Sequence, residues 1–280
     1  MRRIHTDEIT NAIKEMCIRA NYKLSEDVSN AVIQAKETET NELGKHILTK
    51  LCENLEIAEQ DNIPICQDTG MAVVFLKVGQ NLHIDGISLE DAVNEGVRQG
   101  YQEGYLRKSI VGDPIIRENT KDNTPAVIHY EIVPGENLEI TVAPKGFGSE
   151  NMSRVYMLKP SDGIEGVKNA VLETVKLAGP NACPPIVVGV GIGGTFEKCA
   201  ILAKKALTRD LSIHSKIPYI KELEEQLYTK INELKIGPAG LGGNITTLGV
   251  NVETYPTHIA GLPVAINICC HVNRHVHRVL

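Results

Sequence analysis

The chain contains no tryptophan, and aromatic residues make up only 4% of its 280 residues. Hydrophobic residues as a whole account for 42%, so the interior must be built mainly from valine, isoleucine, leucine and alanine. A chain of this length buries one sizeable core or two smaller ones. The composition is therefore that of a globular protein with an aliphatic interior.

An excess of basic residues is also lacking, because 29 Lys and Arg stand against 35 Asp and Glu and the net charge is -6. Nucleic-acid-binding proteins need a basic face that displaces counterions, so we expect no nucleic-acid partner. No run of about 18 apolar residues occurs, as a membrane-spanning helix would require. The first residues are charged and polar where a signal peptide has an apolar core. We therefore expect a cytoplasmic protein with no membrane partner, and a small anionic ligand stays compatible with the charge.

The sequence has no C-x-x-C pair, the local arrangement that is typical of structural zinc sites. Its seven cysteines are an odd number and are scattered over a chain of intermediate length, at positions 17, 52, 66, 183, 199, 269 and 270. Disulfide frameworks are instead typical of short secreted chains. The cysteines are therefore expected to be thiols, some of them metal ligands.

Apolar periodicity predicts helices in the first 60 residues and a mixture of strands and helices afterwards. The predicted strands cover residues 71–78, 126–133, 138–142, 186–190, 245–252 and 263–269. The later predicted helices cover residues 89–104, 164–178, 195–207 and 218–234, the last of them on the surface. We expect Thr6 to cap the first helix of the chain and Ser88 to begin the helix at 89–104.

These patterns predict an α/β (α+β) fold, in which a helical N-terminal region precedes mixed sheets with flanking helices. No linker or repeat interrupts the chain, so we expect one domain over residues 1–280. Its helical front would cover about residues 1–60, and the part that carries the chemistry about residues 61–280.

Polar and thiol residues gather in four junctions that are rich in glycine and proline. The first junction, residues 64–70, has a thiol, an amide, a carboxylate and a hydroxyl in succession at Cys66, Gln67, Asp68 and Thr69. Four such groups do not all belong in a core. Two interpretations are open, namely a reactive site or a turn in which Asp68 caps backbone amides.

The second and third junctions each suggest a way to hold a ligand. In residues 144–151, Gly146 and Gly148 flank Phe147, so that backbone amides could approach an anion. An ordinary loop is the alternative there. In the third junction Cys183 stands just before two prolines, which would present its thiol rigidly, as a metal ligand requires. The alternative for Cys183 is a buried, inert thiol.

The fourth junction is the C-terminal sequence Cys269-Cys270-His271, which His258 precedes. Neighbouring side chains of a strand point to opposite faces, so at most one of these two cysteines can serve a given site. The tail that follows is basic. We expect four of its side chains to lie in solvent: Arg274, His275, His277 and Arg278.

A glycine run over residues 189–194 matches the G-x-G-x-x-G pattern of dinucleotide-binding proteins. That pattern also needs a second strand that ends in an acidic residue, and residues 208–215 do not form one. Close packing of a helix on a strand explains the glycines equally well. An oxidoreductase that binds NAD through these glycines is thus an alternative function.

Four motifs occur in order along the chain: I-C-Q-D-T-G, K-G-x-G-S-E-N, N-A-C-P-P and N-x-x-C-H-x-x-R-H. Together they resemble the N-terminal, cluster-binding half of class I (iron–sulfur) fumarases and the alpha subunit of L-tartrate dehydratase. In that family three cysteines hold a 4Fe-4S cluster with one iron open to the substrate. The resemblance implies Cys66, Cys183 and Cys270 as the ligands, since Cys270 directly precedes His271.

The resemblance implies a hydro-lyase acting on a four-carbon dicarboxylate, either fumarate/L-malate or L-tartrate, which is dehydrated to oxaloacetate. Asp68 is implied as a catalytic residue, together with Gln67 and Thr69. The implied substrate contacts are Gln67, Asp68, Arg107, Gly146, Gly148 and His258. The planar guanidinium of Arg107 suits a carboxylate, because it can donate two parallel hydrogen bonds.

The sequence departs from the family in two respects. Phe147 stands where the family's loop has a middle glycine, and the chain ends at Leu280 without the family's second half. The resemblance therefore implies a beta subunit as partner, in a heterotetramer of two alpha and two beta chains. A non-catalytic iron–sulfur or zinc protein is a further alternative, since three cysteines alone would suffice for it.

Overall fold

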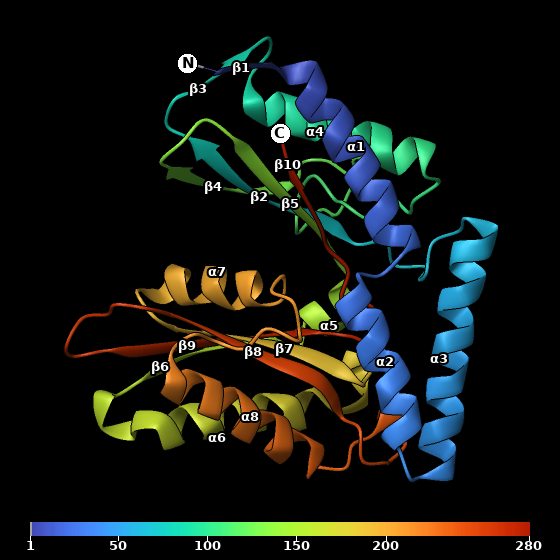
Figure 1. Ribbon diagram of the computed structural model, residues 1–280, viewed down its shortest axis with the longest axis vertical. Coiled ribbons are helices and arrows are strands. Elements are labelled where there is room, and N and C mark those ends of the chain that lie inside the picture. The colour runs from blue at the N-terminus through green and yellow to red at the C-terminus, as the bar shows by residue number, and fades with distance from the viewer. Residues whose placement is uncertain (1) are drawn as a thin grey trace. The chain divides into compact units, whose positions relative to one another are not determined.

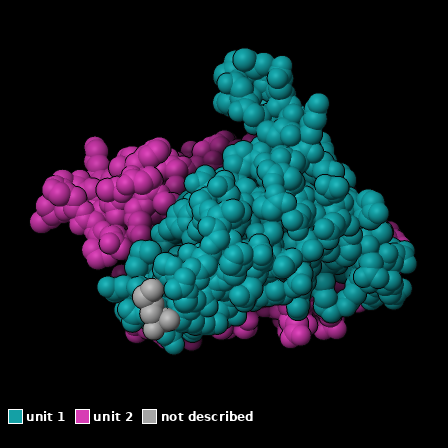
Figure 2. Space-filling model, turned by 90° about the horizontal axis from the view of Figure 1, so that it is seen from above, with its two compact units in different colours: residues 1–25, 55–147, 274–280 teal, residues 26–54, 148–273 magenta. Residues whose placement is uncertain are grey.

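The computed structural model describes residues 2–280 (Figure 1). The chain forms two compact units, each assembled from separate segments and coloured in Figure 2. The first unit comprises residues 1–25, 55–147 and 274–280, and the second comprises residues 26–54 and 148–273. A boundary near residue 60 is close to one of the crossings between units, but the chain also crosses near residues 25, 147 and 273. The expectation of one domain over residues 1–280 stays a prediction.

The first unit is built on a four-stranded sheet in the order β10-β5-β2-β4. Strand β2 (Met71–Gly79) pairs in parallel with β4 (Val127–Val133) and antiparallel with β5 (Leu138–Lys145). Strand β10 (Val276–Val279) pairs antiparallel with β5. A separate parallel pair joins β1 (Arg2–His5) to β3 (Leu82–Asp85).

Helices α1 (Thr6–Tyr22) and α4 (Leu89–Glu103) pack on this sheet. Every second residue of β2 and β5 faces them, which puts the aliphatic residues of both strands in one core. The fully buried Tyr101 of α4 belongs to the same core. Ser88 caps α4 by accepting a hydrogen bond from the Asp91 amide, as predicted. The cap of α1 is His5, so the prediction of Thr6 was wrong by one residue.

The second unit has a four-stranded sheet in the order β6-β9-β7-β8. Strand β7 (Ile186–Gly193) is parallel to β8 (Thr247–Tyr255) and antiparallel to β9 (Leu262–Cys269), and β9 also pairs with β6 (Arg154–Leu158). Helix α7 (Phe196–Ala206) covers one face. Helices α6 (Gly163–Ala178) and α8 (Pro218–Asn232) cover the other (Figure 1).

The remaining helices connect these parts of the chain. Helix α2 (Glu26–Thr38) lies in the second unit, α3 (Glu42–Asp61) runs from the second unit into the first, and α5 (Phe147–Glu150) is a single turn. Short 3-10 turns occur at Pro160–Asp162, Gly179–Ala182 and Pro238–Gly240. The structure confirms the predicted α/β class. None of the helices among residues 2–280 has the length and apolarity to cross a bilayer.

The expectation that four side chains of the basic tail lie in solvent was wrong for Arg274, which is 4% exposed. His277 is exposed, as predicted, and the tail forms β10 at the edge of the first sheet. Residues 218–232 form the predicted surface helix α8, whose apolar face buries Ile220, Leu223 and Leu227 in the core of the second unit. In the junction at 144–151, α5 begins at Phe147.

The glycine run is explained by packing. A Cβ added to Gly189 would lie 2.1 Å from the Ala203 carbonyl oxygen, and one on Gly191 would lie 2.0 Å from that of Cys199. Both glycines are inside β7, and α7 rests directly on them. A dinucleotide fingerprint instead places its glycines in the turn before the helix. The structure thus favours the packing interpretation over the NAD-binding alternative.

Candidate functional site

The first junction forms the loop that connects α3 to β2 in the first unit. Its start is fixed by the Ile65 amide, which donates to the Asn21 carbonyl at 2.9 Å. Its end is fixed by the buried Tyr101 hydroxyl, which contacts the carbonyl oxygens of Thr69 at 2.8 Å and Gly70 at 3.0 Å. The buried Tyr101 of α4 therefore supports the loop that carries these polar residues.

The segment that contains Arg107 is tied to the same loop. The hydroxyl of the buried Thr69 donates to the Arg107 carbonyl at 3.0 Å. Asn123 bridges the two segments as well, since its amide nitrogen donates to the Gly70 carbonyl and its oxygen accepts from the Ser109 amide. The side chain of Arg107 is exposed. Predicted catalytic and substrate-binding residues are thus neighbours in the first unit.

Asp68 holds two backbone amides with its carboxylate. One oxygen accepts from the Gly70 amide and the other from the Phe147 amide, each at 3.0 Å. Asp68 therefore caps backbone amides as the turn interpretation expected, and its catalytic role stays a prediction. The amide that the second junction was expected to offer to an external anion is donated to the protein's own carboxylate. A Cβ on Gly146 would lie 3.2 Å from the same carboxylate oxygen, which explains the glycine there.

Arg274 is a part of this region that sequence analysis misplaced. It is only 4% exposed, and its guanidinium donates to the carbonyl oxygens of Pro144 and Asp68. It was expected in solvent because a basic tail is usually hydrated. The available signal was its place in the fourth motif, N-x-x-C-H-x-x-R-H.

The second unit holds two of the predicted cluster ligands at one end of its sheet. Strand register pairs Val187 with Cys269, so the end of β9 lies beside the start of β7. Cys183 lies three residues before β7 begins. Cys183 adopts a left-handed conformation with φ 52° and ψ 61°. His271 places its Nδ1 atom 3.1 Å from the Cys183 carbonyl oxygen. The segments that carry Cys183 and Cys270 are therefore in direct contact.

The environment of His271 fixes the role of its ring. Burial lowers the pKa of His271, and the hydrogen bond to the Cys183 carbonyl opposes this effect. Because a carbonyl oxygen only accepts, the Nδ1 atom must carry the proton and donate. A neutral ring with its proton on Nδ1 can therefore link the Cys183 turn to the end of β9.

The cysteines differ sharply in exposure. Cys183 is exposed, and Cys66 and Cys270 are partly exposed. The other four are buried: Cys17, Cys52, Cys199 and Cys269. Burial raises the pKa of the Cys17 thiol to about 12. The cysteines that reach solvent are thus the three that the motifs single out.

These three thiols are divided between the units. Cys66 belongs to the first unit, and Cys183 and Cys270 belong to the second. Across residues 2–280, the structure does not gather three or more His, Cys, Asp or Glu side chains into a group that could hold a metal ion. Convergence of the three cysteines on one cluster therefore stays a prediction.

Gly148 and His258 lie in different parts of the second unit. A Cβ on Gly148 would be 4.0 Å from the Asn181 carbonyl oxygen, in the turn before Cys183. His258 is exposed in the connection from β8 to β9, beyond the Tyr255 end of the sheet. The eight residues of β7 separate that end from Cys183, a length of about 26 Å at the usual rise per residue. Within this unit, His258 is not brought together with Cys183 and Cys270.

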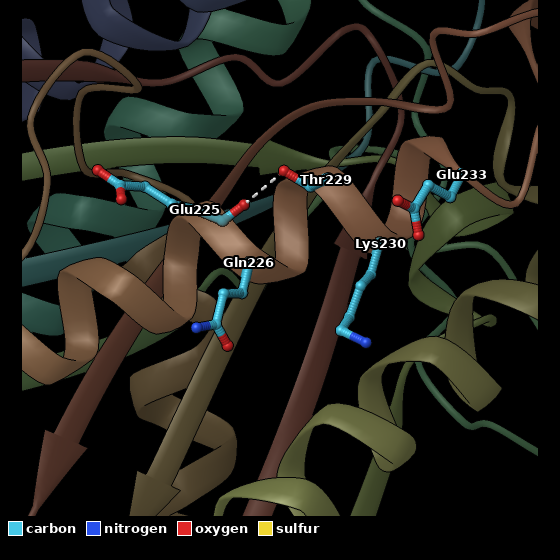
Figure 3. A pocket seen from close by; sticks show the side chains of 5 residues that line it. All are labelled: Glu225, Gln226, Thr229, Lys230 and Glu233. Carbon is cyan, nitrogen blue, oxygen red and sulfur yellow. Dashed lines mark hydrogen bonds between the residues drawn. The ribbon is translucent and has the colours of Figure 1, made fainter.

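His258 instead lines an apolar cavity of about 470 Å³ in the second unit. Side chains from the starts of α6 and α8, including Ile164 and Tyr219, form much of its wall. A second hollow lies along α8 alone (Figure 3). Its lining is polar and comes from successive turns of that helix and from Glu233, which follows the helix: Glu225, Gln226, Thr229, Lys230 and Glu233. A hollow lined by one solvent-facing helix offers no convergent groups for chemistry.

Comparison with known proteins gives consistent matches over nearly the whole chain. The family described as fumarate hydratase (Fumerase) matches residues 10–279. A protein of Methanocaldococcus jannaschii, provisionally named L(+)-tartrate dehydratase subunit alpha, is 45% identical over 273 residues, which is 95% of each chain. L(+)-tartrate dehydratase subunit alpha of Escherichia coli UTI89 is 33% identical over 272 residues, covering 96% of this chain and 89% of its own. The protein of that name from E. coli K12 is 32% identical over the same shares.

Proposed function

The chain belongs to the fumarate hydratase (Fumerase) family and is a hydro-lyase alpha subunit, and we propose that it acts on a four-carbon dicarboxylate with a 4Fe-4S cluster. L(+)-tartrate is the first substrate to test, because the relatives above are named for it. Fumarate and L-malate are the second, because the family is described as fumarate hydratase.

The observation that carries the proposal is the exposure of the cysteines. Cys66, Cys183 and Cys270 reach solvent, while the other four thiols of the chain are buried. Thiolates are the usual ligands of iron–sulfur clusters. Three protein ligands would leave one iron of the cluster open, and the bound cluster would supply a Lewis acid there. The donor set of the chain fits such a cluster.

The chain's own residues would then bind and orient the substrate around Asp68. Asp68 is held by the amides of Gly70 and Phe147, which fixes its carboxylate beside Gly146. Arg107 offers an exposed guanidinium on a segment that is bonded to the Asp68 loop. In this proposal Arg107 binds one substrate carboxylate, and Asp68, with Gln67 and Thr69, serves the proton transfer.

The proposal includes a beta subunit as partner, because the relatives are named as alpha subunits. A dicarboxylate carries two negative charges that must be held while a proton and hydroxide leave neighbouring carbons. Arg107 is an exposed cation on a segment that is bonded to the Asp68 loop. Further cationic groups would come from the partner, in a heterotetramer of two alpha and two beta chains.

Metal analysis tests the cluster directly. Anaerobic reconstitution should give about four irons and four sulfides per chain, the content of one 4Fe-4S cluster. Replacement of Cys66, Cys183 or Cys270 by serine should abolish this content. Cys269→Ser is the matched control, since Cys269 is buried and directly precedes Cys270. Zinc without sulfide at these cysteines, or loss of the cluster in Cys269→Ser alone, would refute the proposed ligand set.

A further inference from the structure

We propose that Arg274 is a positioning residue that sets the orientation of Asp68 by clamping two loops together. The inference rests on the proposed function, in which Asp68 serves the proton transfer. Arg274 was expected in solvent, and the resemblance to the family implies no role for it. Its role is inferred from the contacts of its guanidinium within the first unit.

The guanidinium joins the loop before β2 to the end of β5. Its Nη2 atom donates to the main-chain carbonyl of Asp68, and its Nε atom donates to the carbonyl of Pro144 at 3.3 Å. Asp68 and Arg274 are 206 residues apart in the sequence, and β10, which follows Arg274, is paired with β5. The clamp is therefore anchored by a strand and does not depend on a mobile tail.

The side chain of Asp68 joins the same two segments by a second contact. Its carboxylate accepts from the Phe147 amide, three residues after Pro144. Arg274 thus holds the main chain of Asp68 against one end of residues 144–147, while the Asp68 side chain binds the other end. Both contacts join Asp68 to residues 144–147, so a displacement of the Asp68 main chain would also displace its carboxylate.

Gly146 lies between the two charged groups. A Cβ built there would be 3.2 Å from a carboxylate oxygen of Asp68 and 3.6 Å from Nη2 of Arg274. The absence of a side chain keeps this space open. The guanidinium therefore borders the same space as the candidate catalytic carboxylate.

The charge of Arg274 is buried close to that of Asp68. The side chain of Arg274 is 4% exposed, its hydrogen-bond acceptors are carbonyl oxygens, and its Nη1 atom is buried without a hydrogen-bond partner among the described residues. Burying a cation is costly without a compensating group. The carboxylate of Asp68, on the other side of Gly146, is a negative charge that lies beside it.

Kinetics of the assembled enzyme test the inference first. Arg274→Gln removes the charge, and Arg274→Lys keeps the charge but loses the fork that reaches two carbonyls. We expect kcat to fall about 10- to 100-fold in Arg274→Gln, with a smaller loss in Arg274→Lys and little change in KM. Arg278→Gln is the matched control, because Arg278 is an arginine of β10 whose partner is Glu15. A rise in KM with unchanged kcat would assign Arg274 to substrate binding and overturn the inference.

Amide hydrogen exchange provides a second readout that needs no activity. The amides of Gly70 and Phe147 donate to Asp68, so their exchange should become at least about 10-fold faster in Arg274→Gln. Amides in the middle of β2 and β5, and all amides in Arg278→Gln, should be unchanged. If Arg274→Gln does not fold, the same comparison is made with Arg274→Lys. Unchanged exchange at Gly70 and Phe147 in a folded variant would overturn the clamp.

The two readouts separate this inference from the proposed function. Faster exchange at Gly70 and Phe147 in Arg274→Gln, together with an assembled wild-type enzyme that has no hydro-lyase activity, would refute the proposed function and leave the clamp standing. Full hydro-lyase activity in Arg274→Gln, with protected amides, would refute the clamp and leave the proposed function standing.

Discussion

At the scale of single residues, exposure separates the cysteines into two groups. A thiol reacts as the thiolate, and burial without a compensating charge disfavours that form. Burial raises the pKa of Cys17 to about 12 and also raises that of Cys199. Buried cysteines of this kind behave as small hydrophobic residues.

Alkylation of the reduced, cluster-free chain should therefore be selective. Iodoacetamide at pH 8 should modify Cys66, Cys183 and Cys270 in the folded chain, and all seven cysteines after unfolding. Peptide mass spectrometry measures the modified positions. Modification of Cys269 before Cys270 would contradict the choice of ligand within that pair.

A second prediction at this scale concerns the space beside Asp68 that Gly146 leaves open. In Gly146→Ala the new Cβ would press on a carboxylate oxygen of Asp68 at 3.2 Å, so the carboxylate must move. We expect kcat of the assembled enzyme to fall about 10- to 100-fold, because a small misplacement of a reacting group is costly. Gly112→Ala is the control, since a Cβ there meets no atom closer than 3.8 Å. Equal activity of both variants would show that Asp68 tolerates displacement.

At the scale of elements, α8 is held to its sheet by a buried charge as well as by its apolar face. Glu224 is 1% exposed, and its carboxylate accepts from the Arg209 guanidinium and from the amides of Val252 and Ser215. His214 lies 3.3 Å from the same carboxylate. One side chain of α8 thus joins the helix to β8 and to the segment that follows α7.

Replacing this carboxylate should destabilise the second unit strongly. Glu224→Ala leaves the amides of Val252 and Ser215 without their acceptor and removes one of the partners of Arg209, which keeps Glu253 and Asn251. We expect a cost of about 3 kcal/mol, because buried donors left unpaired are costly. Chemical denaturation measures the change in the free energy of unfolding. Glu222→Ala, on the exposed side of α8, should stay within about 0.5 kcal/mol of the wild type. Comparable losses in the two variants would mean that the buried network contributes little.

At the scale of the whole molecule, the proposed function places the site on more than one polypeptide. The isolated, cluster-loaded chain should show negligible dehydration of L(+)-tartrate or L-malate, and activity should appear when the beta subunit is added. Titration of the beta subunit against a fixed amount of this chain measures both activity and stoichiometry. Full activity of this chain alone would contradict the two-subunit proposal.

The α/β class and most helices and strands could be predicted from the sequence, which also contains the four motifs that indicate the family. Helices and strands have local sequence signals, because apolar residues recur at the period of the element. A capping residue is a local signal as well, and Ser88 caps α4 as predicted. The contacts between distant segments could not be predicted in this way and became visible in the fold. It buried Arg274 against the Asp68 loop across 206 residues, paired β10 with β5, and set His258 at the far end of β7 from Cys183. The strand pairing depends on strand order and register, which no local stretch of the sequence encodes. The charge of Arg274 is buried because the fold brings the carbonyl groups of Pro144 and Asp68 together around its guanidinium.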